Sequence, residues 1–261
     1  MSHEIWFESR GTKLFAVDSG QGRPIVLLHG GLANHQSCRV FAAPLAPRFR
    51  IITPDLRGSG RSVHAGPLDW DLLAGDVVAL VDHLGLDSVV LGGISFGAGV
   101  AVRTALRHPR VVSALVVLHP AFGGTELGLT QAQSAAMQAM DAAGSRVVAE
   151  GIEVFYPLFD TLPAELRERA RATVAAHDPA SIATTTRFMC TGGHPFAAGV
   201  ELAAISVPTL VVPGVDATHP AEVADVYRRH ISRCTVRAVD PAGFAAAITD
   251  LVDRELAPTR P

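Results

Sequence analysis

Short runs of apolar residues, separated by polar and glycine-rich stretches, recur along most of the chain. Nearly continuous apolar runs are typical of strands in a sheet that is covered on both faces. Near the start, two shorter runs are joined by Arg10-Gly11, and this pattern predicts a β-hairpin. The strands that we expect are 4–9, 13–18, 24–28, 50–53, 88–92, 114–118, 209–212 and 235–239.

Between these runs the apolar residues change to helical spacing. In residues 72–84 they fall on one face of a helix, and residues 100–107 predict a second helix that Pro109 ends. Strands that alternate with helices imply right-handed crossovers between parallel strands. We therefore predict an α/β fold with a mostly parallel, doubly wound sheet and an antiparallel N-terminal hairpin.

One long segment interrupts this alternation. Residues 122–204 contain several helical patterns, for example 131–143 and 164–176, and no convincing strand. We interpret 122–204 as a helical cap inserted into a core made of residues 1–121 and 205–261. Such a cap should lie over the carboxyl edge of the sheet, where ligands bind in open α/β folds.

Composition and charge limit the possible partners. Of the 261 residues, 48% are hydrophobic and 18% are charged, which is typical of a packed core and not of a disordered chain. The formal net charge is −3, so there is no electrostatic reason to expect nucleic acid or an anionic membrane as a partner.

The cysteines and the first residues indicate a compartment. Cys38, Cys190 and Cys234 are widely spaced and lack metal-ligand spacing, so we expect free thiols in a reducing environment. The start lacks the basic segment and apolar run of a secretory signal, and no apolar stretch approaches the ~20 residues that span a bilayer. We therefore expect a cytoplasmic protein without a membrane partner.

The sharpest chemical signal is the pentapeptide Gly93-Ile94-Ser95-Phe96-Gly97, which fits G-x-S-x-G and lies between an expected strand and an expected helix. The strained turn that this motif forms needs small flanking residues, and glycine has no side chain to clash. The turn would lift the hydroxyl of Ser95 above the sheet at the positive end of a helix. We predict that Ser95 is a nucleophile.

A glycine pair supplies a second signal. His29-Gly30-Gly31-Leu32 directly follows the strand 24–28, so backbone N–H groups there can point into the site. The N–H groups of Gly31 and Phe96 would form a two-donor oxyanion hole. We interpret His29 as a structural residue whose ring orders the loop by hydrogen bonds to the backbone.

A third motif carries a family resemblance. Residues 54–62 read P-D-L-R-G-S-G-R-S, and with H-G-G and G-x-S-x-G they form a series that resembles the α/β-hydrolase superfamily over almost the whole chain. The resemblance implies the α/β-hydrolase fold, with Asp55 and Arg57 as structural loop residues. It also implies that Asp216, just after the strand 209–212, is the triad acid that orients a histidine.

The chain departs from the family pattern at the base of the triad. In the family a histidine follows the last strand, but here residues 240–244 lead directly into a helical pattern and no histidine follows His230. A serine hydroxyl is a poor nucleophile unless a neighbouring base accepts its proton. Another histidine must therefore serve Ser95, or the protein does not carry out this chemistry.

Our prediction for the base is His119, because it ends the strand 114–118 next to the strand that precedes Ser95. A local pair of Asp216 with His219, three residues further on, is an alternative. The remaining candidates lie in the helical segment, after the glycine pair and after the third motif: His194, His35 and His64.

Two functions are compatible with these motifs. The first is a serine-dependent hydrolase of a small apolar ester, thioester or lactone with a rearranged triad. The alternative is a weak or non-hydrolytic member of the fold that binds a small apolar ligand or promotes a rearrangement or cyclisation. An imidazole nitrogen within ~3.5 Å of Ser95 Oγ would favour the first. We expect a small-molecule substrate, no organic cofactor and no metal, since no dinucleotide fingerprint or metal-ligand spacing is present. The oligomeric state is unknown from the sequence.

Overall fold

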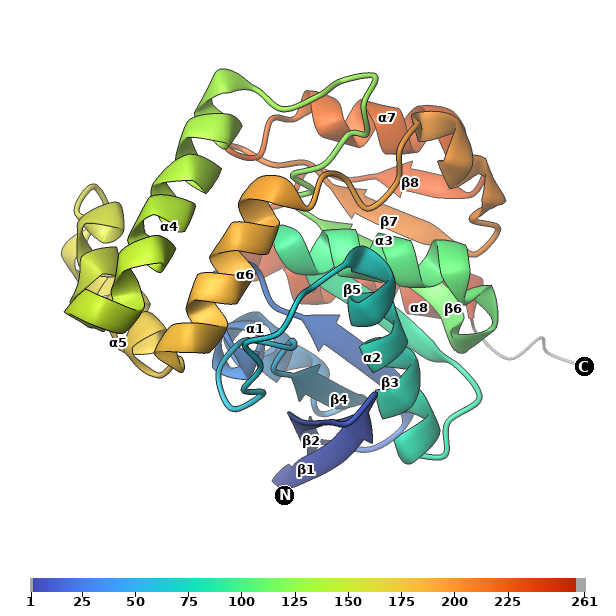
Figure 1. The fold of residues 1–261 in the computed structure, drawn as a ribbon. Coiled ribbons are helices and arrows are strands. Elements are labelled where there is room, and N and C mark those ends of the chain that lie inside the picture. The colour runs from blue at the N-terminus through green and yellow to red at the C-terminus, as the bar shows by residue number, and fades with distance from the viewer. Residues whose placement is uncertain (1, 257–261) are drawn as a thin grey trace, which may run out of the picture.

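A central sheet organises the protein in the computed structural model, which describes residues 2–256 (Figure 1). In these residues the sheet has eight strands in the order β1-β2-β4-β3-β5-β6-β7-β8. The strands are β1 (Ser2–Ser9), β2 (Thr12–Ser19), β3 (Arg23–Leu28), β4 (Phe49–Pro54), β5 (Val89–Ile94), β6 (Val112–Leu118), β7 (Thr209–Val212) and β8 (Cys234–Val236).

The N-terminal part of the sheet is antiparallel and the remainder is parallel. β1 pairs with β2 and β2 pairs with β4 in antiparallel register, whereas every pair from β4 through β3, β5, β6 and β7 to β8 is parallel. The predicted α/β-hydrolase fold, with its N-terminal hairpin and mostly parallel sheet, is confirmed. β8 is shorter than the expected 235–239, because it ends at Val236.

Helices cover both faces of the sheet, so the parallel strands are buried on both sides. On one face α2, α3 and α7 contribute to a large apolar cluster, and on the other α1 and α8 contribute to a second cluster. Successive residues of β3 and β6 alternate between these two clusters, as the two-residue period of a strand requires. These helices are α1 (His35–Ala42), α2 (Trp70–His83), α3 (Phe96–Arg107), α7 (Glu222–His230) and α8 (Phe244–Glu255), with the short 3₁₀ helices η1 (Ala43–Leu45), η2 (Pro109–Val111) and η5 (Pro241–Gly243).

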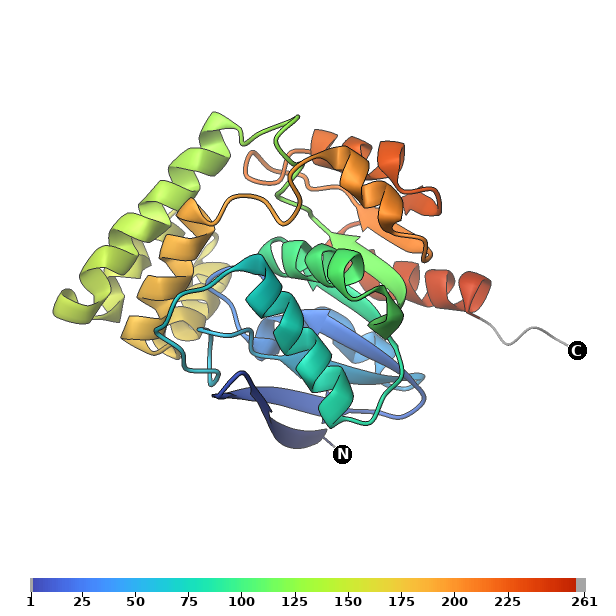
Figure 2. The ribbon, with the colours of Figure 1, turned by 45° about the vertical axis from the view of Figure 1, so that its right-hand side comes forward.

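Between β6 and β7 the chain is helical, as the pattern in residues 122–204 predicts. The elements are α4 (Gln131–Glu150), η3 (Ile152–Phe159), α5 (Ala164–Ala175), α6 (Pro179–Thr191) and η4 (Gly199–Ala204). Figures 1 and 2 show α4, α5 and α6 grouped beyond one end of the sheet. This helical segment has a small apolar cluster of its own, which includes Phe155, Val174 and Ile182. Within residues 2–256, no helix has the length and hydropathy that crossing a bilayer requires.

Candidate active site

The turn between β5 and α3 holds Ser95 in a strained conformation. Its φ is +55° and its ψ is −115°, values that a residue with a side chain adopts only where the surroundings enforce them. A Cβ at Gly93 would overlap the carbonyl of Gly97, and a Cβ at Gly97 would overlap the carbonyl of His29. Both flanking glycines are therefore required by close backbone packing, and the strained turn exposes the hydroxyl of Ser95 at the carboxyl end of the sheet.

Two backbone N–H groups near Ser95 are free to stabilise a developing negative charge. In residues 2–256 the N–H groups of Gly31 and Phe96 donate to no protein acceptor, whereas those of Ala98 and Gly99 donate to the carbonyl of Ser95. The loop of Gly31 lies against the nucleophile turn, since a Cβ at Gly30 would be 3.5 Å from Ser95 Cβ. Both N–H groups thus lie at the strand ends beside Ser95, and the N-terminus of α3 adds its partial positive charge there.

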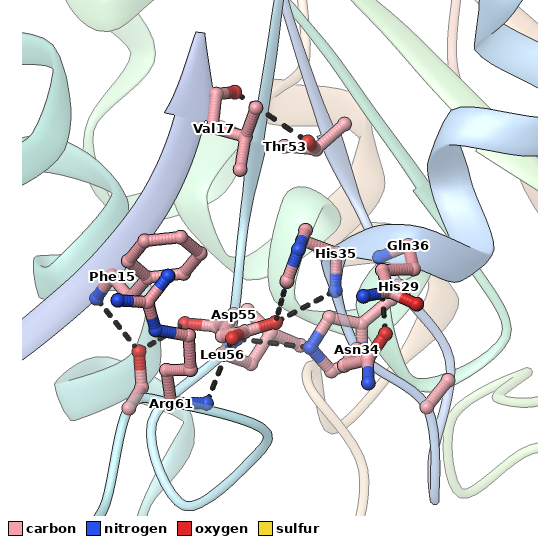
Figure 3. Close-up of polar contacts among 12 residues, drawn as sticks. Phe15, Val17, His29, Asn34, His35, Gln36, Thr53, Asp55, Leu56 and Arg61 are labelled. Carbon is pink, nitrogen blue, oxygen red and sulfur yellow. Dashed lines mark hydrogen bonds and ion pairs between the residues drawn. The ribbon is translucent and has the colours of Figure 1, made fainter. Parts of the chain in front are cut away.

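The imidazole of His29 orders the loop that carries Gly31. Its Nδ1 lies 2.8 Å from Gly30 O, and its Nε2 lies 3.0 Å from the N of Leu56 (Figure 3). A carbonyl must accept and an N–H must donate, so the ring is neutral with its proton on Nδ1. Gly30 O and Gly31 N belong to the same peptide group, and His29 therefore orients the N–H of Gly31, in agreement with its predicted structural role.

Asp55 joins this loop to the rest of the core. It accepts hydrogen bonds from the backbone N of His35 at 2.7 Å and of Arg61 at 2.8 Å, and from His35 Nδ1 at 2.8 Å (Figure 3). Burial alone would raise the pKa of Asp55, but these hydrogen bonds and the nearby His29 lower it. Arg57 is fully buried against the carboxylate of Asp76. In this structure Asp55 and Arg57 hold loops together, as the family resemblance implies.

His219 is the imidazole that reaches Ser95. Its Nε2 lies 2.8 Å from Ser95 Oγ, and its Nδ1 lies 3.1 Å from both carboxylate oxygens of Asp216. Asp216 and His219 are only three residues apart, in one turn between β7 and α7. That turn is closed by the bond from His219 N to Asp216 O at 3.1 Å. Ser95, His219 and Asp216 thus have the connectivity of a serine, histidine and acid triad.

The carboxylate of Asp216 holds the turn as well as the imidazole. Its Oδ1 accepts from the backbone N of Thr218 at 2.8 Å, from the hydroxyl of Thr218 at 2.6 Å and from the backbone N of His219 at 3.0 Å. Partial burial would raise the pKa of Asp216, but these donors and His219 lower it to about 2. Asp216 is therefore ionised at neutral pH, which places the ring proton of His219 on Nδ1 and leaves Nε2 to accept from Ser95.

Gly214 allows this turn to close. A Cβ at position 214 would overlap both the carbonyl and the Cβ of His219, so any side chain there would push the imidazole away. The side chain of Asp216 remains 54% exposed and that of His219 21% exposed. The pair is therefore built by local hydrogen bonds near the surface and not by deep burial.

The structure does not bring His119, our predicted base, into hydrogen-bonding contact with Ser95. The residue has a φ of +44°, and its backbone N donates to Val212 O. Its ring packs edge-on against Phe244 with centroids 5.3 Å apart, and lies 6.3 Å from the ring of His219. Burial and the neighbouring His219 lower the pKa of His119, so it is neutral at pH 7. The prediction of His119 as base was wrong in geometry, because His219 occupies the position beside Ser95 Oγ.

The other candidate histidines have different neighbours. His35 is paired with Asp55, and His64 Nδ1 lies 3.5 Å from the hydroxyl of Thr12. His194 packs on Phe122 with centroids 5.7 Å apart. A signal for His219 is present in the sequence: Thr218 and His219 come two and three residues after Asp216, a spacing that favours a turn capped by the aspartate side chain.

An open pocket of about 380 Å³ adjoins Ser95 on the side of α1 and α8. It is lined by Gly30, Gly31, Ala33, Ser37, Phe41, Ile94, Ser95, His119, Asp216, His219, Pro241 and Phe244. Aromatic residues that could have lined a pocket under the helical segment are instead buried together: Trp70, Phe96, Phe122 and Phe188 pack with centroids 5.2 to 6.0 Å apart. Within residues 2–256, no group of three or more His, Cys, Asp or Glu side chains is arranged to hold a metal ion.

Known proteins resemble this chain in sequence and in fold. A family model described as the alpha/beta hydrolase fold matches residues 23–187. AB hydrolase superfamily protein YisY of Bacillus subtilis is 41% identical over 110 residues, which are 41% of this chain and 41% of that protein. A non-heme haloperoxidase of Rhodococcus erythropolis is 40% identical over 113 residues, 42% of this chain and 41% of that protein. The matched region thus spans about two fifths of these curated relatives. A thermophilic esterase from Thermogutta terrifontis has a similar fold, with a TM-score of 0.78 and 24% identity over 97% of this chain and 98% of that chain.

Proposed function

Because the chain belongs to the α/β-hydrolase fold family by both sequence match and sheet topology, we propose that it is a serine hydrolase of small apolar esters. The observation that carries the proposal is the hydrogen bond between Ser95 Oγ and His219 Nε2 at 2.8 Å, with Asp216 on the opposite ring nitrogen. This contact supplies the base whose absence from the C-terminal loop favoured a non-hydrolytic function. The geometry therefore supports hydrolysis over binding alone.

In the proposed reaction Ser95 Oγ attacks the carbonyl carbon of the ester while its proton passes to His219 Nε2. The negative charge that develops on the carbonyl oxygen receives hydrogen bonds from the N–H groups of Gly31 and Phe96. Collapse of this intermediate expels the alcohol, which takes the proton from His219. Water then gives a proton to His219 and attacks the acyl carbon on Ser95. Collapse of this second intermediate breaks the bond to Ser95 Oγ, which takes the proton back from His219, and the acid is released. Asp216 stabilises the protonated imidazole in both halves.

The pocket beside Ser95 supports a small and mainly apolar substrate. Its volume of about 380 Å³ is near the lower end of the range for ligand pockets, and Phe41, Pro241 and Phe244 form an apolar wall. No lysine or arginine lines it, so nothing in the pocket selects a phosphorylated substrate. We infer that the ester reaches Ser95 from the side of α1 and α8.

Intact-mass labelling with a fluorophosphonate tests the proposal, because the reagent reacts with activated serines. We expect one adduct on the wild type and none on Ser95→Ala. Ser37→Ala is a matched control, since Ser37 is a second hydroxyl in the same pocket and its removal should leave labelling intact. His219→Ala should label far more slowly. An unlabelled wild type, beside a reference serine esterase that labels, would refute the proposed function.

A further inference from the structure

The turn that carries Asp216 and His219 is contacted by side chains at the start of the helical segment, chiefly that of Gln133. Gln133, in the first turn of α4, is 2% exposed. Its Nε2 donates to Ala121 O at 2.7 Å and to Thr218 O at 3.1 Å. Its Oε1 accepts from the backbone N of Thr130 at 2.8 Å, which closes the cap of the helix. A buried amide with all its polar groups engaged is held in one orientation.

The bond to Thr218 O acts on the peptide group that precedes the imidazole. The carbonyl of this peptide is held by Gln133, and its N–H belongs to His219 and is held by Asp216 Oδ1 at 3.0 Å. The peptide plane is thus fixed from both sides. A shift of this peptide group would displace Cα of His219, and with it the Nε2 that lies 2.8 Å from Ser95 Oγ.

The neighbouring peptide of the turn has a similar anchor. The hydroxyl of Thr130, the residue that caps α4, lies 3.4 Å from Ala217 O. Both contacts come from the start of α4. This end of the helical segment therefore contacts two successive carbonyl groups of the turn. Such support matters here because the carboxylate of Asp216 is 54% exposed and water competes for its hydrogen bonds.

We propose that Gln133 is a positioning residue of the hydrolytic site: its amide fixes the Thr218–His219 peptide and so holds the imidazole in line with Ser95. This proposal rests on the proposed function. It assigns to the helical segment a part in aligning the base.

The test is Gln133→Met, which keeps the length of the side chain and removes both donors. Active sites are first counted by fluorophosphonate labelling, and kcat per active site and KM are then measured with p-nitrophenyl acetate. We expect kcat to fall about 10- to 100-fold, the effect of a small misalignment of reacting groups, while KM changes by less than about 3-fold. The pocket residues are untouched, which is why KM should be preserved.

Gln133→Glu separates positioning from packing. Its carboxylate still accepts from Thr130 N, so the helix cap remains, but it cannot donate to Ala121 O or Thr218 O. At pH 8 kcat per active site should fall at least as far as in Gln133→Met. Below about pH 6 the carboxyl group regains one O–H donor, so the ratio of the variant's kcat to that of the wild type should rise severalfold. If Gln133→Met does not fold, this variant carries the test.

Thr185→Val is the matched control. Thr185 is also buried in the helical segment, and its hydroxyl also reaches a core carbonyl, that of Gly58 at 3.1 Å, but it does not touch the turn. We expect a similar loss of stability and an unchanged kcat per active site. If Gln133→Met and Gln133→Glu behave like Thr185→Val, with wild-type kcat per active site, the proposal is wrong. A wild type that does not label overturns the proposed function, and this proposal with it.

Discussion

Protonation of His29 should destabilise the fold at mildly acidic pH. The ring is fully buried, and its two nitrogens are matched to a carbonyl and to an N–H, an arrangement that only the neutral ring satisfies. Burial lowers the pKa of His29 to about 4, although the nearby Asp55 and the carbonyl of Gly30 partly oppose this. The unfolded chain instead binds this proton near pH 6.5.

The size of the stability loss follows from the difference between the pKa of His29 in the folded state and in the unfolded state. Between about pH 6.5 and about pH 4 the unfolded state holds a proton at His29 that the folded state lacks, so unfolding takes up a proton. The free energy of unfolding is unaffected by His29 above this window and falls as the pH drops through it. At 1.36 kcal/mol per pH unit, the loss is about 3 kcal/mol in total, and it levels off below about pH 4.

Urea unfolding of the wild type and of His29→Gln, at half-unit steps from pH 7.5 to 4, measures this loss. The variant has no titrating ring at this position, while the other buried histidines contribute to both proteins and cancel in the difference. We expect the wild type to lose about 3 kcal/mol more than the variant between pH 7 and pH 4, with equal m-values. If the free energies of unfolding of the two proteins fall in parallel with pH, the reasoning is refuted, because His29 would then bind its proton equally in the folded and unfolded states.

The remaining predictions concern the site. His219→Ala should lower kcat about 10⁴-fold or more, whereas His119→Phe, which keeps the packing on Phe244, should lower it less than about 10-fold; ester hydrolysis at pH 8 compares them. Asp216→Asn can still accept from Thr218 N but presents an amide to His219, so kcat should fall about 10⁴-fold with a small change in Tm. Gly214→Ala should reduce kcat per active site more than about 10-fold by displacing His219, and equal kcat in variant and wild type would contradict the overlap argument. Ser37→Leu should narrow the pocket and raise KM for p-nitrophenyl butyrate more than for the acetate, and an equal change for both esters would place the acyl chain elsewhere.

The fold was predictable because the sheet is buried on both faces. Strands such as 114–118 and 209–212 read as continuous apolar runs, and G-x-S-x-G falls between a strand and a helix, so local patterns and long-range topology agree. The positions of Gly31 and Phe96 beside Ser95 were predictable for the same reason, since both come shortly after strand ends. The short β8 was not, because an edge strand with one neighbour leaves a weak apolar pattern.

The histidine that contacts Ser95 Oγ could not be predicted from positions along the sheet. His119 stands at a strand end beside Ser95, but its ring packs on Phe244, away from hydrogen-bonding reach of Ser95 Oγ. His219 reaches Ser95 only because Asp216 caps a turn that reverses the chain, and that reversal depends on contacts with Gly214 and Gln133. The spacing of Asp216 and His219 alone indicates that the two side chains can pair. The direction of the His219 imidazole depends on tertiary contacts.

The Asp216–His219 pair and the connection from β8 to α8 line the same pocket. Because the imidazole beside Ser95 comes from the turn after β7, the connection from β8 to α8 does not have to place a histidine there. It is short here, and Pro241 and Phe244 form an apolar wall where the connection passes the site. Phe122 and Phe188 of the helical segment pack against Trp70 of α2. The pocket beside Ser95 is thus bounded on the side of α1 and α8 by this short connection.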